Sequence, residues 1–96
     1  MRLEISPLAE FDLEAIGDYI AQDSTVNAVR FVEGLRAQCE KITRSPMAYV
    51  ARLELADGLR SCSHGRYIIF FRIAIDVVHI VRILHIAMDA NSANFS

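Results

Sequence analysis

The sequence is most constrained by residues 66–89, RYIIFFRIAIDVVHIVRILHIAMD, two long apolar runs with a polar break at Asp76. Each run is rich in Ile, Val, Phe and Tyr, whose side chains pack well on the pleated surface of a sheet. Periodicity alone also allows a helix in a continuous apolar run. The β-branched residues and the central Asp76 argue against a helix, so we predict a long β-hairpin.

Arg72, Arg82 and His85 interrupt this apolar hairpin and need an explanation. Side chains alternate between the two faces of a strand. In the first strand, one face carries Ile69, Phe71 and Ile73, and the other carries Ile68, Phe70 and Arg72. In the second strand, one face carries Val81, Ile83 and His85, and the other carries Ile80, Arg82 and Leu84. Because burying an unpaired charge beneath helices is costly, both arginines should face away from any helical layer.

The face that carries the arginines would then be open and would mix charge with apolar side chains. Such an exposed apolar patch usually marks an interaction site. We therefore predict a partner-binding surface made of Ile68, Phe70, Arg72, Ile80, Arg82 and Leu84. The alternative is that Arg72 and Arg82 only pair with acids such as Glu4 or Asp89.

The N-terminal half predicts one strand and two helices. Leu3 and Ile5 alternate with polar residues, as in a half-buried strand over residues 2–6, and Ser6–Pro7 is a helix start. The first helix should bury Leu8, Phe11, Ala15, Ile16, Tyr19 and Ile20. A second helix should start within residues 23–25, end at Ser45–Pro46, and bury Ala28, Val29, Val32, Leu35, Cys39 and Ile42. The short connection makes the pair an antiparallel hairpin.

The remaining segments complete the topology. Residues 47–57 have no clear pattern, residues 59–63 are typical of a short strand, and the tail ANSANFS should be mobile unless a partner orders it. The order β-α-α-β-β-β predicts one α+β domain over residues 1–96. In it, the helical hairpin packs on a mainly antiparallel sheet of about four strands.

Charge and composition narrow the function. The net charge of -2 lacks the basic excess of a general nucleic-acid-binding protein, so we expect no sequence-specific DNA binding. Cys39 and Cys62 lack metal or redox spacing, and His79 and His85 are about 20 Å apart in an extended strand. We expect neither metal nor cofactor. The N-terminus has no signal-peptide core and charges cut every apolar run, so we expect a cytoplasmic protein without a membrane span.

Several short motifs occur in a fairly specific order: Ser45–Pro46, Gly58-Leu59-Arg60, Arg66–Tyr67, Phe71–Arg72, and Val81-Arg82-Ile83-Leu84-His85 followed by Asp89. Together they resemble the RelE/ParE superfamily of bacterial type II toxins, and the R-I-L-H segment is similar to the ParE branch. The resemblance implies a toxin that poisons DNA gyrase without chemistry of its own. It also implies a hetero-oligomeric complex with an acidic, partly disordered or helical antitoxin, docked on the six-residue surface above. Asp89, Asn91 and Phe95 in the tail would contact the target.

The RelE branch, which cleaves messenger RNA in the ribosome, is the alternative. Its chemistry needs an acid-base group, for which His85 is the candidate, and cations to stabilise the transition state. The candidate cations are Arg60, Arg66, Arg72 and Arg82. Against this, the chain has one lysine, Lys41, and no tyrosine after His85. An acidic protein also gains little from counterion release on RNA. We therefore favour the non-hydrolytic ParE-like function.

Overall fold

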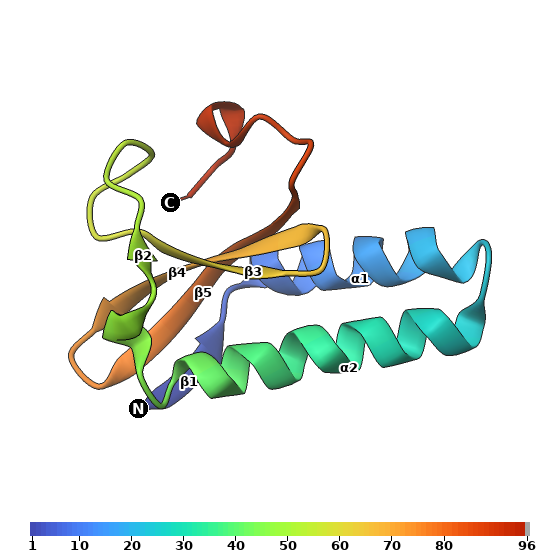
Figure 1. The fold of residues 1–96 in the computed structure, drawn as a ribbon, viewed down its shortest axis with the longest axis horizontal. Coiled ribbons are helices and arrows are strands. Elements are labelled where there is room, and N and C mark those ends of the chain that lie inside the picture. Colours follow the sequence, from blue (N-terminus) through green and yellow to red (C-terminus); the bar gives the residue numbers. More distant parts are fainter. Residues whose placement is uncertain (96) are drawn as a thin grey trace.

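The computed structural model describes residues 1–95, which form a sheet covered on one face by two helices (Figure 1). Its elements are β1 (Arg2–Ile5), α1 (Pro7–Ala21), α2 (Thr25–Ile42), the 3-10 turn η1 (Pro46–Ala48), β2 (Val50–Ala51), β3 (Arg60–His64), β4 (Tyr67–Ala74), β5 (Val77–His85) and the 3-10 turn η2 (Ala90–Ser92). The predicted α+β architecture is confirmed. The segment without a clear sequence pattern adds η1 and a fifth, two-residue strand, β2.

The sheet has the order β1-β5-β4-β3-β2, with β1 parallel to β5 and the other pairs antiparallel. The predicted hairpin of residues 66–89 is confirmed as β4 and β5, which lie near the centre. Parallel pairing of two strands needs a long connection between them. The chain between β1 and β5, which includes both helices, provides that connection.

Both helices begin where the sequence predicts. The Ser6 hydroxyl accepts a hydrogen bond from the Ala9 N–H (3.0 Å), with Pro7 at the first helical position of α1. The Ser24 hydroxyl accepts from the Asn27 N–H (3.2 Å) at the start of α2. These caps satisfy amide groups that have no partner within a helix. The two helices lie side by side and antiparallel, as predicted (Figure 1).

The predicted buried face of α1 is wrong in part. Ala9, Leu13 and Ile16 are buried beneath the helix, whereas Leu8, Phe11, Ala15 and Tyr19 are exposed. Phe11 and Tyr19 are 69% and 68% exposed. Apolar residues follow two neighbouring stripes of α1, and the sheet covers only one. In α2 the predicted set is buried or half-buried except for Val29, which is exposed.

A β-bulge in the central hairpin changes which side chains of β5 face the helices. Phe70 pairs with Arg82 but Phe71 pairs with Ile80, so Val81 is the extra residue. An extra residue in one strand reverses the alternation beyond it. Ile80 therefore packs in the helix-side core with Phe71, and Val81 packs on the other face, the opposite of the predicted assignment.

Candidate functional site

The sheet face that the sequence predicts to be open is closed. Residues 55–59 and the C-terminal tail fold across it and form a second core, whose buried members are Leu59, Phe70, Val81, Leu84 and Phe95. Phe70 is 1% exposed, and its ring lies 4.8 Å from that of Phe95, centroid to centroid. Of the six residues predicted to bind a partner, Phe70, Ile80 and Leu84 are buried, and Ile68, Arg72 and Arg82 are half-buried. The prediction of an open binding face is wrong, because the tail is packed rather than mobile.

Arg72 holds the tail on the sheet. Its guanidinium donates hydrogen bonds to the backbone carbonyls of Asp57 (Nε, 3.2 Å) and Phe95 (Nη1). These carbonyls belong to irregular backbone, which has no ladder of its own to satisfy them. The charge inside β4 is therefore explained by a contact within the chain.

Arg82 is held by Asp12 of α1. Two guanidinium nitrogens donate to the two carboxylate oxygens, Nε at 2.8 Å and Nη2 at 2.9 Å, in the bidentate geometry that suits arginine. The same carboxylate accepts from the Ile83 N–H (2.9 Å), and Arg82 also donates to the Asn94 carbonyl (3.2 Å). The hydrogen bond to Asp12 raises the pKa of Arg82. The suggested pairing of an arginine with an acid is thus correct in kind, but the acid is Asp12 rather than Glu4 or Asp89.

The arginines proposed for ribonuclease chemistry do not meet at one place. Arg60 donates to the Tyr49 carbonyl (2.6 Å), and Arg72 is bound to the tail. His85 lines two shallow pockets, one together with Arg82 and the other together with Arg66, and neither Arg60 nor Arg72 is in the lining of these two pockets.

His85 has a local structural role. Its ring packs edge-on against Tyr67, with centroids 5.1 Å apart, and its Nδ1 accepts a hydrogen bond from the Ala87 N–H (3.0 Å). Because Nδ1 accepts, the ring proton of the neutral imidazole is on Nε2. The second histidine of the hairpin, His79, lies near the start of β5, whereas His85 ends the strand. The Nδ1 atom of His79 is 3.4 Å from Oε2 of Glu4.

The three tail residues predicted to contact a target differ in position. Asp89 is exposed and caps η2 by accepting from the Asn91 N–H (3.0 Å) and the Ser92 hydroxyl (3.2 Å). The hydrogen bond from the Asn91 backbone lowers the pKa of Asp89. Asn91 is also exposed, but Phe95 is buried in the second core. Asp89 and Asn91 remain predicted contacts, whereas Phe95 is unavailable while the tail is in place.

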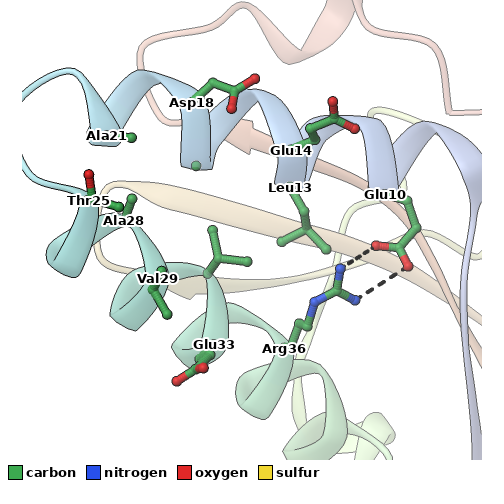
Figure 2. Close-up of a pocket in the computed structure, with 12 residues that line it drawn as sticks. Glu10, Leu13, Glu14, Asp18, Ala21, Thr25, Ala28, Val29, Glu33 and Arg36 are labelled. Atoms are coloured by element: carbon green, nitrogen blue, oxygen red, sulfur yellow. Dashed lines mark hydrogen bonds and ion pairs between the residues drawn. The ribbon is translucent and has the colours of Figure 1, made fainter.

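A groove between α1 and α2 is the surface that the sequence prediction missed. Its volume is about 520 Å³, and its floor is formed by Leu13, Ala28, Val32 and other small or apolar residues. Figure 2 shows carboxylates along both rims, with Glu14 and Asp18 on α1 and Glu33 on α2. Arg36 is the one cation of the lining and donates to both oxygens of Glu10 (2.7 and 3.4 Å). In the sequence, Glu10, Glu14 and Asp18 recur every four residues, a pattern that equally fits a solvated helix face.

Among residues 1–95, no group of three or more His, Cys, Asp or Glu side chains is placed to hold a metal ion. No helix in the same residues has the length and apolar character needed to cross a membrane.

Comparison with known proteins gives a consistent answer. Residues 3–90 match the family model described as the ParE toxin of the type II toxin-antitoxin system parDE. The toxin ParE1 of Caulobacter vibrioides is 32% identical over 89 residues, which cover 92% of each chain.

Two solved structures share the fold. A chain of the chromosomal ParDE TA system from P. aeruginosa has a TM-score of 0.76 at 23% identity, over 88% of this chain and 95% of that one. A chain of the toxin-antitoxin complex RelBE2 from Mycobacterium tuberculosis has a TM-score of 0.54 at 26% identity, with the same coverage. The resemblance to the ParE branch is confirmed, and the chain belongs to the ParE toxin family of type II toxin-antitoxin systems.

Proposed function

We propose that the protein acts by binding DNA gyrase and inhibiting it, and that a cognate antitoxin neutralises it. The observation that carries this proposal is that most of the candidate arginines already have hydrogen-bond partners within the chain. Arg60, Arg72 and Arg82 are bound to backbone carbonyls or to Asp12, so three of the four cations considered for RNA cleavage already have partners within the chain. A toxin without an assembled set of catalytic groups has to act by occupying its target.

The antitoxin would dock in the groove between α1 and α2. An apolar floor flanked by carboxylates suits an amphipathic helix with apolar residues on one face and lysine or arginine at its borders. Glu14, Asp18 and Glu33 would meet those cations, and the small side chains Gly17, Ala21 and Ala28 allow a helix to approach closely. At this surface the partner would be basic, which differs from the acidic segment that the family resemblance implied.

Supercoiling by purified gyrase tests the target. The protein should inhibit the enzyme in a dose-dependent manner, and the antitoxin should restore activity at equimolar amounts. Undiminished supercoiling at a large excess of the folded protein would exclude gyrase. Primer extension on transcripts from induced cells tests the ribonuclease alternative, since cuts that disappear in His85→Ala would favour it.

A substitution in the groove tests antitoxin docking. Val29→Lys places a cation in the groove lining, where it should repel a basic helix and weaken antitoxin binding about tenfold or more. Growth arrest should persist, because the target surface is unchanged. Val26→Lys is the matched control, since Val26 is exposed on the same helix but does not line the groove. Equal antitoxin affinity for both variants, measured by calorimetry, would place the docking site elsewhere.

A further inference from the structure

The turn between β4 and β5 carries an apolar side chain where folding does not favour one. Ala74 and Val77 form the last pair of the hairpin, so Ile75 and Asp76 make a two-residue turn. Ile75 is 97% exposed and has a φ of 55°. It is the one residue other than glycine with a positive φ in residues 1–95.

Neither burial nor backbone geometry accounts for an isoleucine at this position. A β-branched residue with positive φ is a true outlier, and glycine or asparagine is usual there in a hairpin turn. The neighbouring turn between β3 and β4 has the expected residue, Gly65, at a φ of 58°. The same sheet therefore contains one turn that follows the rule and one that breaks it. Residues with a strained backbone of this kind cluster at functional sites.

The turn is also tied to the sheet by backbone hydrogen bonds. Both strands pair up to its two residues, and the carbonyl of Asp76 accepts a hydrogen bond from the Arg2 N–H of β1 (2.8 Å). Figure 1 shows the tip projecting from the sheet at the end away from the connection between α1 and α2. A side chain on a fixed support loses little conformational entropy on binding, which makes it a good anchor for a pocket on another protein.

The tip is separate from the groove assigned to the antitoxin, because that groove is lined only by residues 10–36. A toxin that acts by occupation needs a second surface, one for its target. We propose that Ile75 is the anchor of that surface and enters an apolar pocket on the target protein. This inference rests on the proposed function, in which the target is bound and not cleaved.

The test compares Ile75→Asn with Ile75→Val. Asparagine tolerates positive φ. The melting temperature of Ile75→Asn should therefore lie between that of the wild type and about 4 °C above it. Its concentration for half-inhibition of gyrase should nevertheless rise about tenfold or more, and growth arrest should weaken in parallel. Ile75→Val keeps an apolar β-branched side chain and should stay within about threefold of the wild type. Val26→Asn, which places asparagine at an exposed apolar position of α2, is the control and should inhibit normally.

Two results would overturn the inference. One is wild-type potency of Ile75→Asn in both gyrase inhibition and growth arrest. The other is a lower melting temperature together with weaker antitoxin binding, because that outcome assigns the isoleucine a structural role. A failure of the proposed function is seen in the wild type. If the wild type arrests growth but leaves gyrase active, gyrase is not the target. Growth arrest by the Ile75 variants then decides the role of Ile75. A wild type that arrests nothing removes both proposals.

Discussion

The two faces of the sheet are closed in different ways. On the helix side, α1 and α2 supply Leu13, Leu35 and Ile42 to a large core around Phe71 and Ile83. On the other side, irregular backbone supplies Leu59 and Phe95 to a smaller core around Phe70. The first cover satisfies its own backbone hydrogen bonds within helices. The second depends on two arginines, which donate to its carbonyls.

This difference implies that the two covers open at different free energies. Regions with few apolar contacts and little regular structure open locally, below the free energy of global unfolding. The tail should therefore detach while the helices remain packed. Arg82 belongs to both sides, since it contacts Asp12 of α1 and the carbonyl of Asn94.

The helix-side core should be the least tolerant of substitution. Phe71→Ala should lower the free energy of unfolding by about 3–5 kcal/mol, because the cavity it leaves is enclosed by packed elements. For a small domain that is a large share of the total stability. Urea denaturation monitored by circular dichroism measures the change. Phe11→Ala removes an exposed ring and should change the free energy by less than about 0.5 kcal/mol.

Asp12 links the two sides and should come next. The side chains of Asp12 and Arg82 are 11% and 17% exposed, so Asp12→Ala leaves a mostly buried guanidinium without its carboxylate. We expect a loss of about 2–3 kcal/mol, less than for a fully buried pair. The double variant Asp12→Ala/Arg82→Met removes the uncompensated charge and should recover part of the loss. Additive losses in this double-mutant cycle would contradict a direct interaction.

Phe95→Ala should affect the tail side alone. A terminal segment can rearrange around the missing ring, so we expect a loss of about 2 kcal/mol, below the usual range for a core phenylalanine. Amide hydrogen exchange should speed up in residues 86–95 and in residues 55–59, while α1 and α2 keep the protection expected from the new global stability. Equal acceleration in the helices would show that the two covers open together.

Arg72→Met should loosen the tail with a smaller effect on the whole fold. Methionine keeps much of the apolar stem but donates no hydrogen bond, so we expect a loss of about 1 kcal/mol. Limited proteolysis should cut the tail faster than in the wild type. Arg66→Met, at an exposed position, should leave the cleavage rate unchanged.

The smallest effect at neutral pH concerns Cys39 in the helix-side core. Burial raises the pKa of its thiol from 9.0 to about 12. The unfolded thiol ionises near pH 9 and the folded one near 12, so this group contributes stability below pH 9 that is lost as the pH rises toward 12. In a Cys62→Ala background, Ellman's reagent at pH 8 should label Cys39 only as fast as the protein unfolds. Rapid labelling of the folded protein would contradict this burial.

Local patterns in the sequence predicted the elements but not the way they meet. The hairpin of residues 66–89, the cap at Ser6 and the start of the second helix within residues 23–25 depend on neighbouring residues, and all were found. The buried stripe of α1 was assigned wrongly because both stripes are apolar, and only the position of the sheet decides between Leu13 and Phe11.

The candidate surfaces failed for a related reason. The bulge at Val81, the pairing of Arg82 with Asp12, and the return of Phe95 to Phe70 join residues far apart in the chain. No short-range pattern carries that information. The groove between the helices was missed because its acidic rim and a solvated helix face have the same sequence signature. The exposed Ile75 was missed because it belongs to an apolar run and lies next to Asp76, the polar break between the two strands.

The parallel pairing of β1 with β5 has a consequence for synthesis on the ribosome. Residues 2–5 pair with residues 77–80, which the ribosome adds about 75 residues later (77 − 2). Pairing over such a separation is slow, because a long loop has to close before any contact forms. The nascent chain can form its helical hairpin early, but β1 has no partner until β5 has emerged. The sheet is therefore completed only after β5 has emerged, and a nascent chain that stops before β5 has neither the parallel β1–β5 pair nor the second core.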